Sequence, residues 1–249
     1  MESMKVLRNS QIIILGICIA AATIAASVIL SQGFLKVMKF TREQIAVTGA
    51  AQQNIKSDLI VWTASFSRRD SASAPAYKEL KKDLEKVKKY LVSRGLKENE
   101  IMVYQIITKP VFKKNEKGNN TSDIQGYVLV QNIQIKSDDV DMITRLSRES
   151  TELIDQDIEF SSGAPEYYYT KLNELKIEML ARATQNAKQR AENMTRATGN
   201  KIGFMRSAKM GVFQITPVNS TEVSNWGVND TSSLEKKVTA VVSVSFAIE

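Results

Sequence analysis

The sequence predicts an α+β fold, a mainly antiparallel sheet covered by helices, preceded by one N-terminal transmembrane helix. Three observations predict it. Some ranges alternate apolar with polar residues, as strands do, and others repeat apolar residues at spacings of three and four, as helices do. The strand ranges come mostly in adjacent pairs with helices between the pairs, an order that favours antiparallel pairing. An uncharged apolar stretch over residues 12–35 precedes all of them.

The stretch 12–35 predicts a retained membrane anchor. As a helix it would be roughly 36 Å long, and the hydrocarbon core of a bilayer is about 30 Å thick. A cleaved signal peptide would have a shorter apolar region and a small-residue exit site, for which Ala25–Ser27 is the candidate. Because apolar residues continue beyond that site, we expect an anchor. Its lipid-facing side chains are Ile12, Leu15, Ile19, Ile24, Val28, Leu30 and Phe34.

The anchor divides the chain. Residues 1–11 are expected to form a short N-terminal tail, 36–43 a linker, and 44–249 the folded domain, for which the order of elements also allows two halves, 44–136 and 137–249. Basic residues flank the anchor on both sides, so the positive-inside rule gives no orientation.

The folded domain begins with two strands over residues 44–67. The second strand has a clear apolar face at period two. That face holds Ile60, Trp62, Ala64 and Phe66.

A helix is expected next, over residues 75–94, with Ser73 as its N-cap and Gly95 as the left-handed residue that ends it. Its apolar stripe holds Tyr77, Leu80, Leu84, Val87 and Leu91. The other positions hold lysines beside Glu79, Asp83 and Glu85. Such a pattern is typical of a solvated face with ordinary charge pairs, and it favours that interpretation over a basic partner surface.

A hairpin is expected over residues 102–112 and 126–136, with a polar, mobile connector between its arms. Ser137 is the expected cap of a short helix. The apolar positions of this helix are Val140, Ile143, Leu146 and, after a gap, Leu153. A short strand near 157–161 and an extended segment over 166–170 follow.

The longest helix of the domain is expected over residues 172–198. Three of its core positions are alanines at spacing four, so its axis can lie close to the sheet. The core face holds Leu172, Leu175, Met179, Ala183, Ala187, Ala191 and Met194. Two strands close the chain, 202–215 and 238–248, and a polar loop over 216–237 separates them. A loop of that length is usually functional or disordered.

The composition excludes most catalytic chemistry. The chain has no histidine, and its one cysteine lies in the anchor. Ser–His and Cys–His nucleophiles and Cys/His zinc sites are therefore excluded. The acidic residues form no calcium-loop motif and the glycines no phosphate loop, so we expect no metal, no cofactor and no catalytic residues. The net charge of +7 is dispersed; it suits an anionic membrane surface and gives no basis for nucleic-acid binding.

Two groups of aromatic residues are the candidate contact sites. Trp226 stands alone in the long polar loop. Large aromatic side chains are usually buried, so the favoured expectation is that it folds back on the body; the alternative is contact with a partner or the membrane interface. Tyr167, Tyr168 and Tyr169 are consecutive and could line a groove. Alternate residues of a strand point to opposite faces, so at least one should be core.

Several segments together resemble the SIMPL-domain family. They are residues 47–49, 56–62, 172–176, 179–187, 191–192, 199–215 and 236–242. The resemblance covers nearly all of 44–249, depends on the order and spacing of these segments, and is closest to bacterial members with an N-terminal anchor. It implies a body outside the cytoplasm, in the periplasm or at the cell surface, and a homo-oligomer. The family offers no established catalytic residues to carry over.

We therefore expect a single-pass membrane protein whose body acts by binding or self-assembly in the cell envelope, without catalysis. The resemblance to the SIMPL-domain family also implies a stress-related role. The expected partners are membrane lipid and a second copy or an envelope protein. Two alternatives stay open. One is an accessory subunit of a larger membrane complex, held through the small residues 20–27 of the anchor. The other is a hydrolase that uses carboxylates or a Ser–Lys pair.

Overall fold

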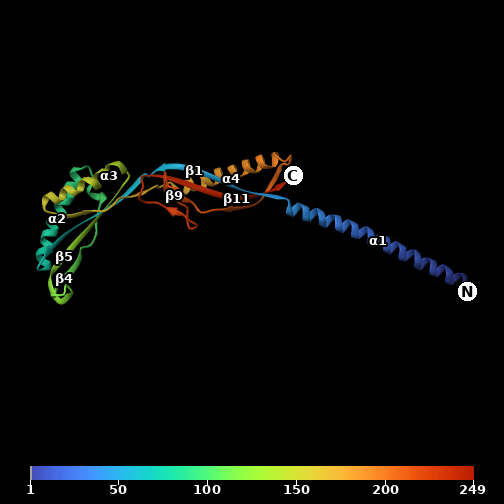
Figure 1. Cartoon of the computed structure of the whole chain (residues 1–249), viewed down its shortest axis with the longest axis horizontal. Coiled ribbons are helices and arrows are strands. Elements are labelled where there is room, and N and C mark those ends of the chain that lie inside the picture. Colours follow the sequence, from blue (N-terminus) through green and yellow to red (C-terminus); the bar gives the residue numbers. More distant parts are fainter. Residues whose placement is uncertain (1) are drawn as a thin grey trace. The chain divides into compact units, whose positions relative to one another are not determined.

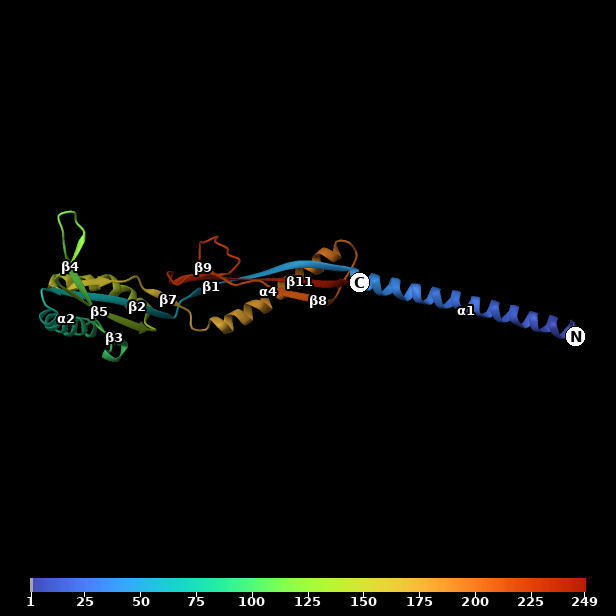
Figure 2. The same ribbon diagram turned by 90° about the horizontal axis from the view of Figure 1, so that it is seen from below.

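The structure is a computed structural model that describes residues 2–249, with side chains over 15–35, 38 and 43–249 (Figures 1 and 2). The chain divides into two compact units. Unit 1 holds Met1–Ala50, Ala181–Gly211 and Val241–Glu249, and unit 2 holds Ala51–Leu180 and Val212–Ala240. These units differ from the sequence halves 44–136 and 137–249. The reason is that two long strands and the longest helix of the body each contribute residues to both units.

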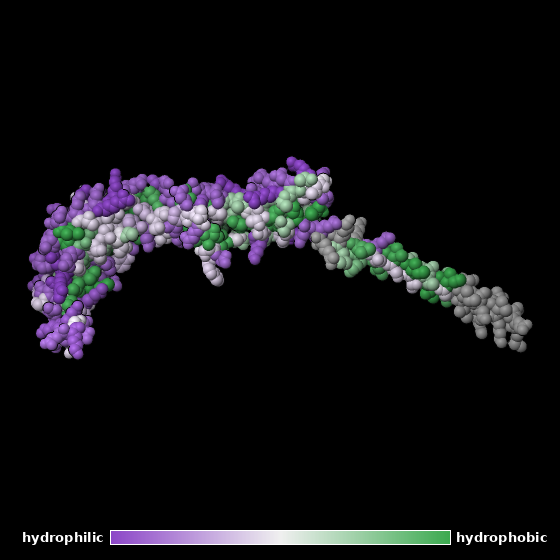
Figure 3. Space-filling view, in the orientation of Figure 1, coloured by the Kyte–Doolittle hydropathy of each residue, from purple (hydrophilic) through white to green (hydrophobic). Residues whose placement is uncertain are grey.

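Helix α1 (Glu2–Arg42) contains the apolar stretch. Leu15–Leu35 is long and apolar enough to cross a membrane, and it is not buried against the rest of the chain. The anchor side chains from Leu15 to Phe34 are exposed, and apolar residues dominate this part of Figure 3; the Ile12 side chain lies outside the described residues. The helix continues through 36–42, where the sequence predicts a linker.

Two polar side chains within the apolar stretch, Thr23 and Ser27, bond to their own helix. Thr23 Oγ1 donates to Ile19 O at 3.0 Å, and Ser27 Oγ donates to Thr23 O at 2.8 Å. A lipid environment would otherwise leave these hydroxyl groups without partners.

Unit 2 contains a six-stranded sheet in the order β3-β5-β2-β6, in which β4 also pairs with β5 and β7 with β2. Its strands are β2 (Leu59–Asp70), β3 (Ile101–Val103), β4 (Ile107–Lys114), β5 (Asn120–Ser137), β6 (Glu159–Ser162) and β7 (Glu166–Tyr168). All pairs are antiparallel. The central pair runs from Ile60 opposite Ser137 to Asp70 opposite Tyr127.

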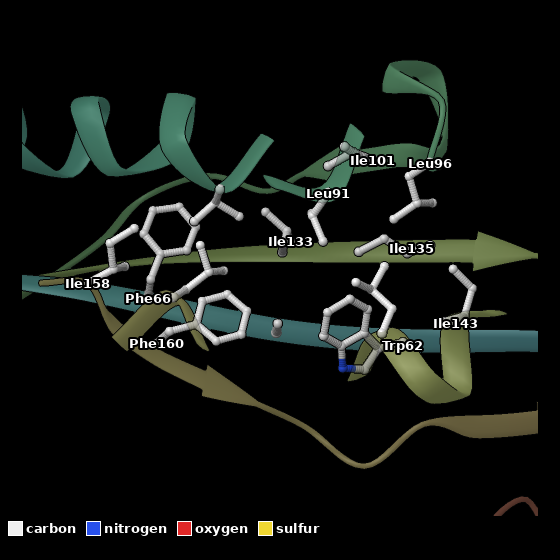
Figure 4. Packing of buried hydrophobic residues seen from close by; sticks show 14 of the residues in the cluster. Trp62, Phe66, Leu91, Leu96, Ile101, Ile133, Ile135, Ile143, Ile158 and Phe160 are labelled. Carbon is white, nitrogen blue, oxygen red and sulfur yellow. The ribbon is translucent and has the colours of Figure 1, made fainter. Parts of the chain in front are cut away.

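Helices α2 (Ser73–Ser93) and α3 (Val140–Glu149), with the 3₁₀ segments Glu98–Glu100 and Ser150–Gln156, complete unit 2. Their apolar residues form one core with the apolar side chains of β2 and β5. Figure 4 shows Trp62, Leu91 and Ile135 converging there. Trp62 satisfies its ring N–H by donating to Ser162 Oγ at 3.1 Å.

The expected N-caps of both helices are wrong, whereas the expected end of α2 at Gly95 is right. Ser73 is already helical, and Ala72 is the N-cap, with Ala72 N donating to Asp70 Oδ1 at 3.2 Å. For α3 the cap is Asp139, which accepts from Met142 N, because Ser137 ends strand β5 instead. Gly95 ends α2 as expected: its φ is 105°, and Leu96 N donates to Leu91 O across the turn.

The predicted first hairpin arm, 102–112, is two strands, β3 and β4, whereas the second arm, predicted over 126–136, is longer than expected, since β5 already begins at Asn120. The turn occupies only Asn115–Asn119, where Asn115 Oδ1 accepts from Lys117 N and Asn119 N, both at 3.0 Å. The side-chain amide thus orders a segment for which the composition suggests a mobile connector.

The remaining strands form a second, five-stranded sheet in the order β1-β11-β9-β10, with β8 also paired to β11. They are β1 (Gln44–Lys56), β8 (Ile202–Met210), β9 (Gln214–Pro217), β10 (Val228–Asn229) and β11 (Glu235–Ile248). The α+β class is confirmed, but there are two sheets. The predicted strand 202–215 is two strands, β8 and β9, separated by residues 211–213, and the predicted loop 216–237 contains β10.

Helix α4 (Leu172–Arg196) packs closely on β1 within unit 1, as its alanines predict. Ala183 and Ala187 are fully buried, and a Cβ added to Gly49 would overlap with their atoms. The same helix also satisfies the backbone of β1: Asn186 Oδ1 accepts from Ala50 N and Arg190 donates to Thr48 O. The expected core residue Met194 is exposed, because buried Thr195 continues the stripe instead.

Candidate binding site

Trp226 is the most exposed large apolar side chain described, with 94 % of its surface accessible. It lies between β9 and β10 in unit 2. The expectation that it folds back on the body is wrong. The alternative, contact with a partner or the membrane interface, stays a prediction.

Hydrogen bonds hold the loop around Trp226. Gln214, which is buried at the start of β9, donates from Nε2 to Ser224 O at 2.7 Å and accepts from Ser224 N at 3.3 Å. Lys237 Nζ donates to Ser220 O at 2.9 Å, and Trp226 N donates to Ser224 Oγ at 3.2 Å. The backbone that carries the exposed indole is thus fixed, which lowers the conformational entropy lost when a partner binds it.

The three consecutive tyrosines occupy different environments. Tyr167 is buried, its hydroxyl group lies 3.1 Å from Thr144 Oγ1, and its backbone N donates to Thr231 O. Tyr168 and Tyr169 are half-buried. The hydrogen bond from Tyr168 to Glu166 and partial burial raise the pKa of Tyr168. The alternation along β7 accounts for the one tyrosine in the core.

All three tyrosines line one small pocket of ≈ 90 Å³ in unit 2. The other lining residues are Ile55, Leu172, Ile215, Asn229, Asp230, Thr231 and Lys236. Two of these residues are ionisable groups that the sequence interpretation missed.

Lys236 is buried in the pocket wall. Its Nζ donates to Tyr167 O at 2.6 Å and to Asp230 O at 2.5 Å. Burial lowers the pKa of Lys236, and the charge of Asp230 opposes that shift. A signal was present in the sequence, because Lys236 stands in the same period-two register as Val238 and Ala240, which face the core.

Asp230 is the second ionisable group. Its Oδ1 accepts from Ser232 N at 2.8 Å and from Ser232 Oγ at 2.7 Å. Burial raises the pKa of Asp230, but these hydrogen bonds and the charge of Lys236 outweigh it, so the pKa lies below its ordinary value. The pocket therefore combines aromatic walls, a cation and an anion, which suits binding of a small polar group.

The acidic residues that follow β5 have structural roles. Asp139 caps α3, and Asp141 pairs with Lys56 at 3.1 Å. Within the described residues no three acidic or cysteine side chains are grouped as metal ligands would be.

A second buried charge, Asp83 on α2, was expected on the solvated face. It pairs with Arg68 of β2, which also contacts Asp157 at 3.2 Å. Hydrogen bonding to Asp83 raises the pKa of Arg68. This ion pair joins α2 to the sheet and lies apart from the tyrosine pocket in sequence and in lining residues.

Comparison with known proteins identifies a family. The model of the family SIMPL, described as a protein of unknown function (DUF541), matches residues 45–246. No curated protein matches the chain. Among solved structures, the de novo designed protein Foldit4 is 19 % identical, with 42 % of this chain and 93 % of that chain covered and a TM-score of 0.23. A likeness that weak carries no argument about fold or function.

Proposed function

The chain belongs to the SIMPL family, and from this premise we propose that it is a membrane-anchored module that acts outside the cytoplasm by binding or self-assembly, without catalysis. The anchor is α1, whose span Leu15–Leu35 meets the length and apolarity that a bilayer requires. The body is the family domain that follows it.

The observation that carries the binding role is Trp226. An indole that is 94 % exposed on a hydrogen-bonded loop is unfavourable for an isolated protein, because it leaves a large apolar surface in water. Tryptophan is among the residues that contribute most to protein interfaces. The neighbouring exposed Val223 enlarges the apolar contact. A second copy of the chain or another envelope protein is the proposed occupant.

Site-specific photo-crosslinking tests this role. A photoreactive phenylalanine analogue at position 226 of the full chain should yield adducts in intact cells. The same analogue at Tyr77, an exposed aromatic position on α2 of the same unit, is the matched control and should yield none. In the chain without the analogue, Trp226→Ser should reduce co-purification of the partner identified in this way by about 10-fold or more, the effect of losing an interface hot spot. Equal yields at both positions, or none at either, would contradict the proposal.

The tyrosine pocket favours a second candidate, a hydrolase. Lys236 and Asp230 are two ionisable groups with shifted pKa in one concavity, as an acid–base site would have. However, the hydrogen bonds described for Lys236 Nζ join two backbone carbonyls rather than a serine hydroxyl, so a Ser–Lys nucleophile is not assembled there. Assay of the full chain against ester, peptide and glycoside substrates decides this point. Turnover that Lys236→Met abolishes would replace the binding proposal.

A further inference from the structure

We propose that the end of unit 1 beside the anchor is a docking surface for anionic lipid headgroups; this rests on the proposed membrane anchor. Helix α1 ends at Arg42, and the next residue, Glu43, accepts a hydrogen bond from Ile248 N. On the other side of β11, Lys201 and Glu249 exchange two backbone hydrogen bonds at 2.8 Å. With about 4.8 Å between neighbouring strands, Lys201 lies roughly 10 Å from the point where the anchor meets the body.

This end of unit 1 comes close to the bilayer. The apolar span ends at Leu35, and the seven residues that continue the helix add only about 10 Å. The headgroup layer beyond the hydrocarbon is itself about 5 to 8 Å thick. Extended lysine and arginine side chains at this end can therefore reach the lipid phosphates.

Two exposed cations lie here. Arg196 and Lys201 line a surface pocket of ≈ 470 Å³, together with the buried Thr195 and with Asn200. Within the described residues neither cation has an ion-pair partner, since the nearby Glu192 pairs with Lys188. The helix dipole alone favours a cation such as Arg196 in the last turn of α4. It does not explain Lys201, which lies beyond the end of the helix.

Exposed apolar side chains follow Lys201 in the sequence, on β8. Phe204 is 54 % exposed and Met205 is 52 % exposed, and both follow Lys201 within four residues. Apolar and polar residues are intermixed on the face of unit 1 shown in Figure 3. Exposed aromatic and cationic residues within one short segment are a combination that interfacial membrane contacts use, with the ring at headgroup depth and the cation on phosphate.

The test uses the full chain with Cys18 replaced by serine and an environment-sensitive fluorophore on Phe204→Cys. The chain is reconstituted into phosphatidylcholine vesicles, with or without phosphatidylglycerol, and flotation reports whether it is anchored. We expect a blue shift of the emission only in the anionic vesicles, weakened by added salt because exposed charges are screened. A fluorophore on Tyr77→Cys in unit 2 serves as the site control and should not shift.

Charge reversal completes the test. Arg196→Glu with Lys201→Glu should abolish the shift, whereas Lys109→Glu on β4, an exposed cation of unit 2, should leave it unchanged. Equal emission in both vesicles, or a shift that survives the double reversal, would overturn the docking surface while the anchor stands. Loss of the shift on adding inorganic phosphate at constant ionic strength would also overturn it, in favour of a soluble phosphate ligand. A chain that fails to float contradicts the anchor itself and the docking surface with it.

Discussion

Lys236 keeps a charge inside unit 2 because main-chain carbonyls replace the water that it loses. The carbonyl oxygens of Tyr167 and Asp230 accept its hydrogen bonds, and one belongs to β7 while the other precedes β11. The residue therefore joins segments far apart in sequence at the wall of the tyrosine pocket. A buried cation with a lowered pKa also makes the stability of the unit depend on pH.

The sign of this dependence follows from the pKa shift. The pKa of Lys236 is lower in the folded chain than its ordinary 10.5, so between the two values the unfolded chain binds more protons. The free energy of unfolding should therefore rise with pH through this alkaline window. Urea unfolding in detergent measures the free energy of unfolding of the full chain and of Lys236→Met at each pH. The difference between the two chains isolates the contribution of Lys236. Parallel pH profiles for the two chains would contradict it.

The Arg68–Asp83 pair predicts a large effect of a single substitution. Asp83 is almost fully buried, so Asp83→Leu leaves the Arg68 cation without its main partner. The expected loss is about 3 kcal/mol of unfolding free energy, by the rule for breaking a buried pair. Arg68→Met combined with Asp83→Leu should recover most of it, because no buried charge is left unpaired. A double variant no more stable than Asp83→Leu would contradict this account.

At the scale of elements, α4 and β1 depend on small residues at their crossing. A methyl group at Gly49 would meet Ala183 and Ala187 of the helix. We expect Gly49→Ala to lower the free energy of unfolding by about 1–3 kcal/mol, the usual effect of overpacking. Ala50→Val, on the exposed face of the same strand, is the matched control and should change it by less than about 0.5 kcal/mol. Urea unfolding of both chains measures the difference.

The Trp226 loop is the other element whose geometry can be tested. Gln214→Ala removes both hydrogen bonds that hold Ser224. Hydrogen exchange followed by mass spectrometry should then show faster exchange of the amides over 220–227, with no change over β5. The yield of crosslinking from position 226 should also fall in this variant, since a more mobile loop loses more conformational entropy on binding. Unchanged exchange in the variant would show that other contacts fix the loop.

Most helices and strands can be predicted from local sequence patterns. The burial of charged residues cannot, because it depends on the tertiary structure. The alanines of α4 predicted a close approach because their spacing is a local property. Asp83 and Lys236 were placed in solvent or passed over, because a charged side chain in a core register is explained only by a partner distant in sequence. The division into two sheets was missed for the same reason, since strand pairing joins β1 to β11 across most of the chain. Trp226 was expected to be buried because that is the ordinary fate of its residue type.

The whole molecule consists of a family domain that presents an exposed tryptophan and one N-terminal helix long and apolar enough to span a membrane, which we propose ties the domain to the bilayer. The three consecutive tyrosines 167–169 suggested a groove from the sequence alone. The two ionisable residues in the wall of the tyrosine pocket, Lys236 and Asp230, became visible only in the structure. The family itself has no assigned function, so location and contact are the properties to measure first.

Thiol labelling in intact cells tests the central claim most directly. The full chain carries Trp226→Cys as its one thiol, with Cys18 replaced by serine, and is exposed to a membrane-impermeant maleimide before lysis. We predict that position 226 is labelled in intact cells and that the labelled chain sediments with the membranes. Labelling only after lysis, or a labelled chain in the soluble fraction, would contradict the account.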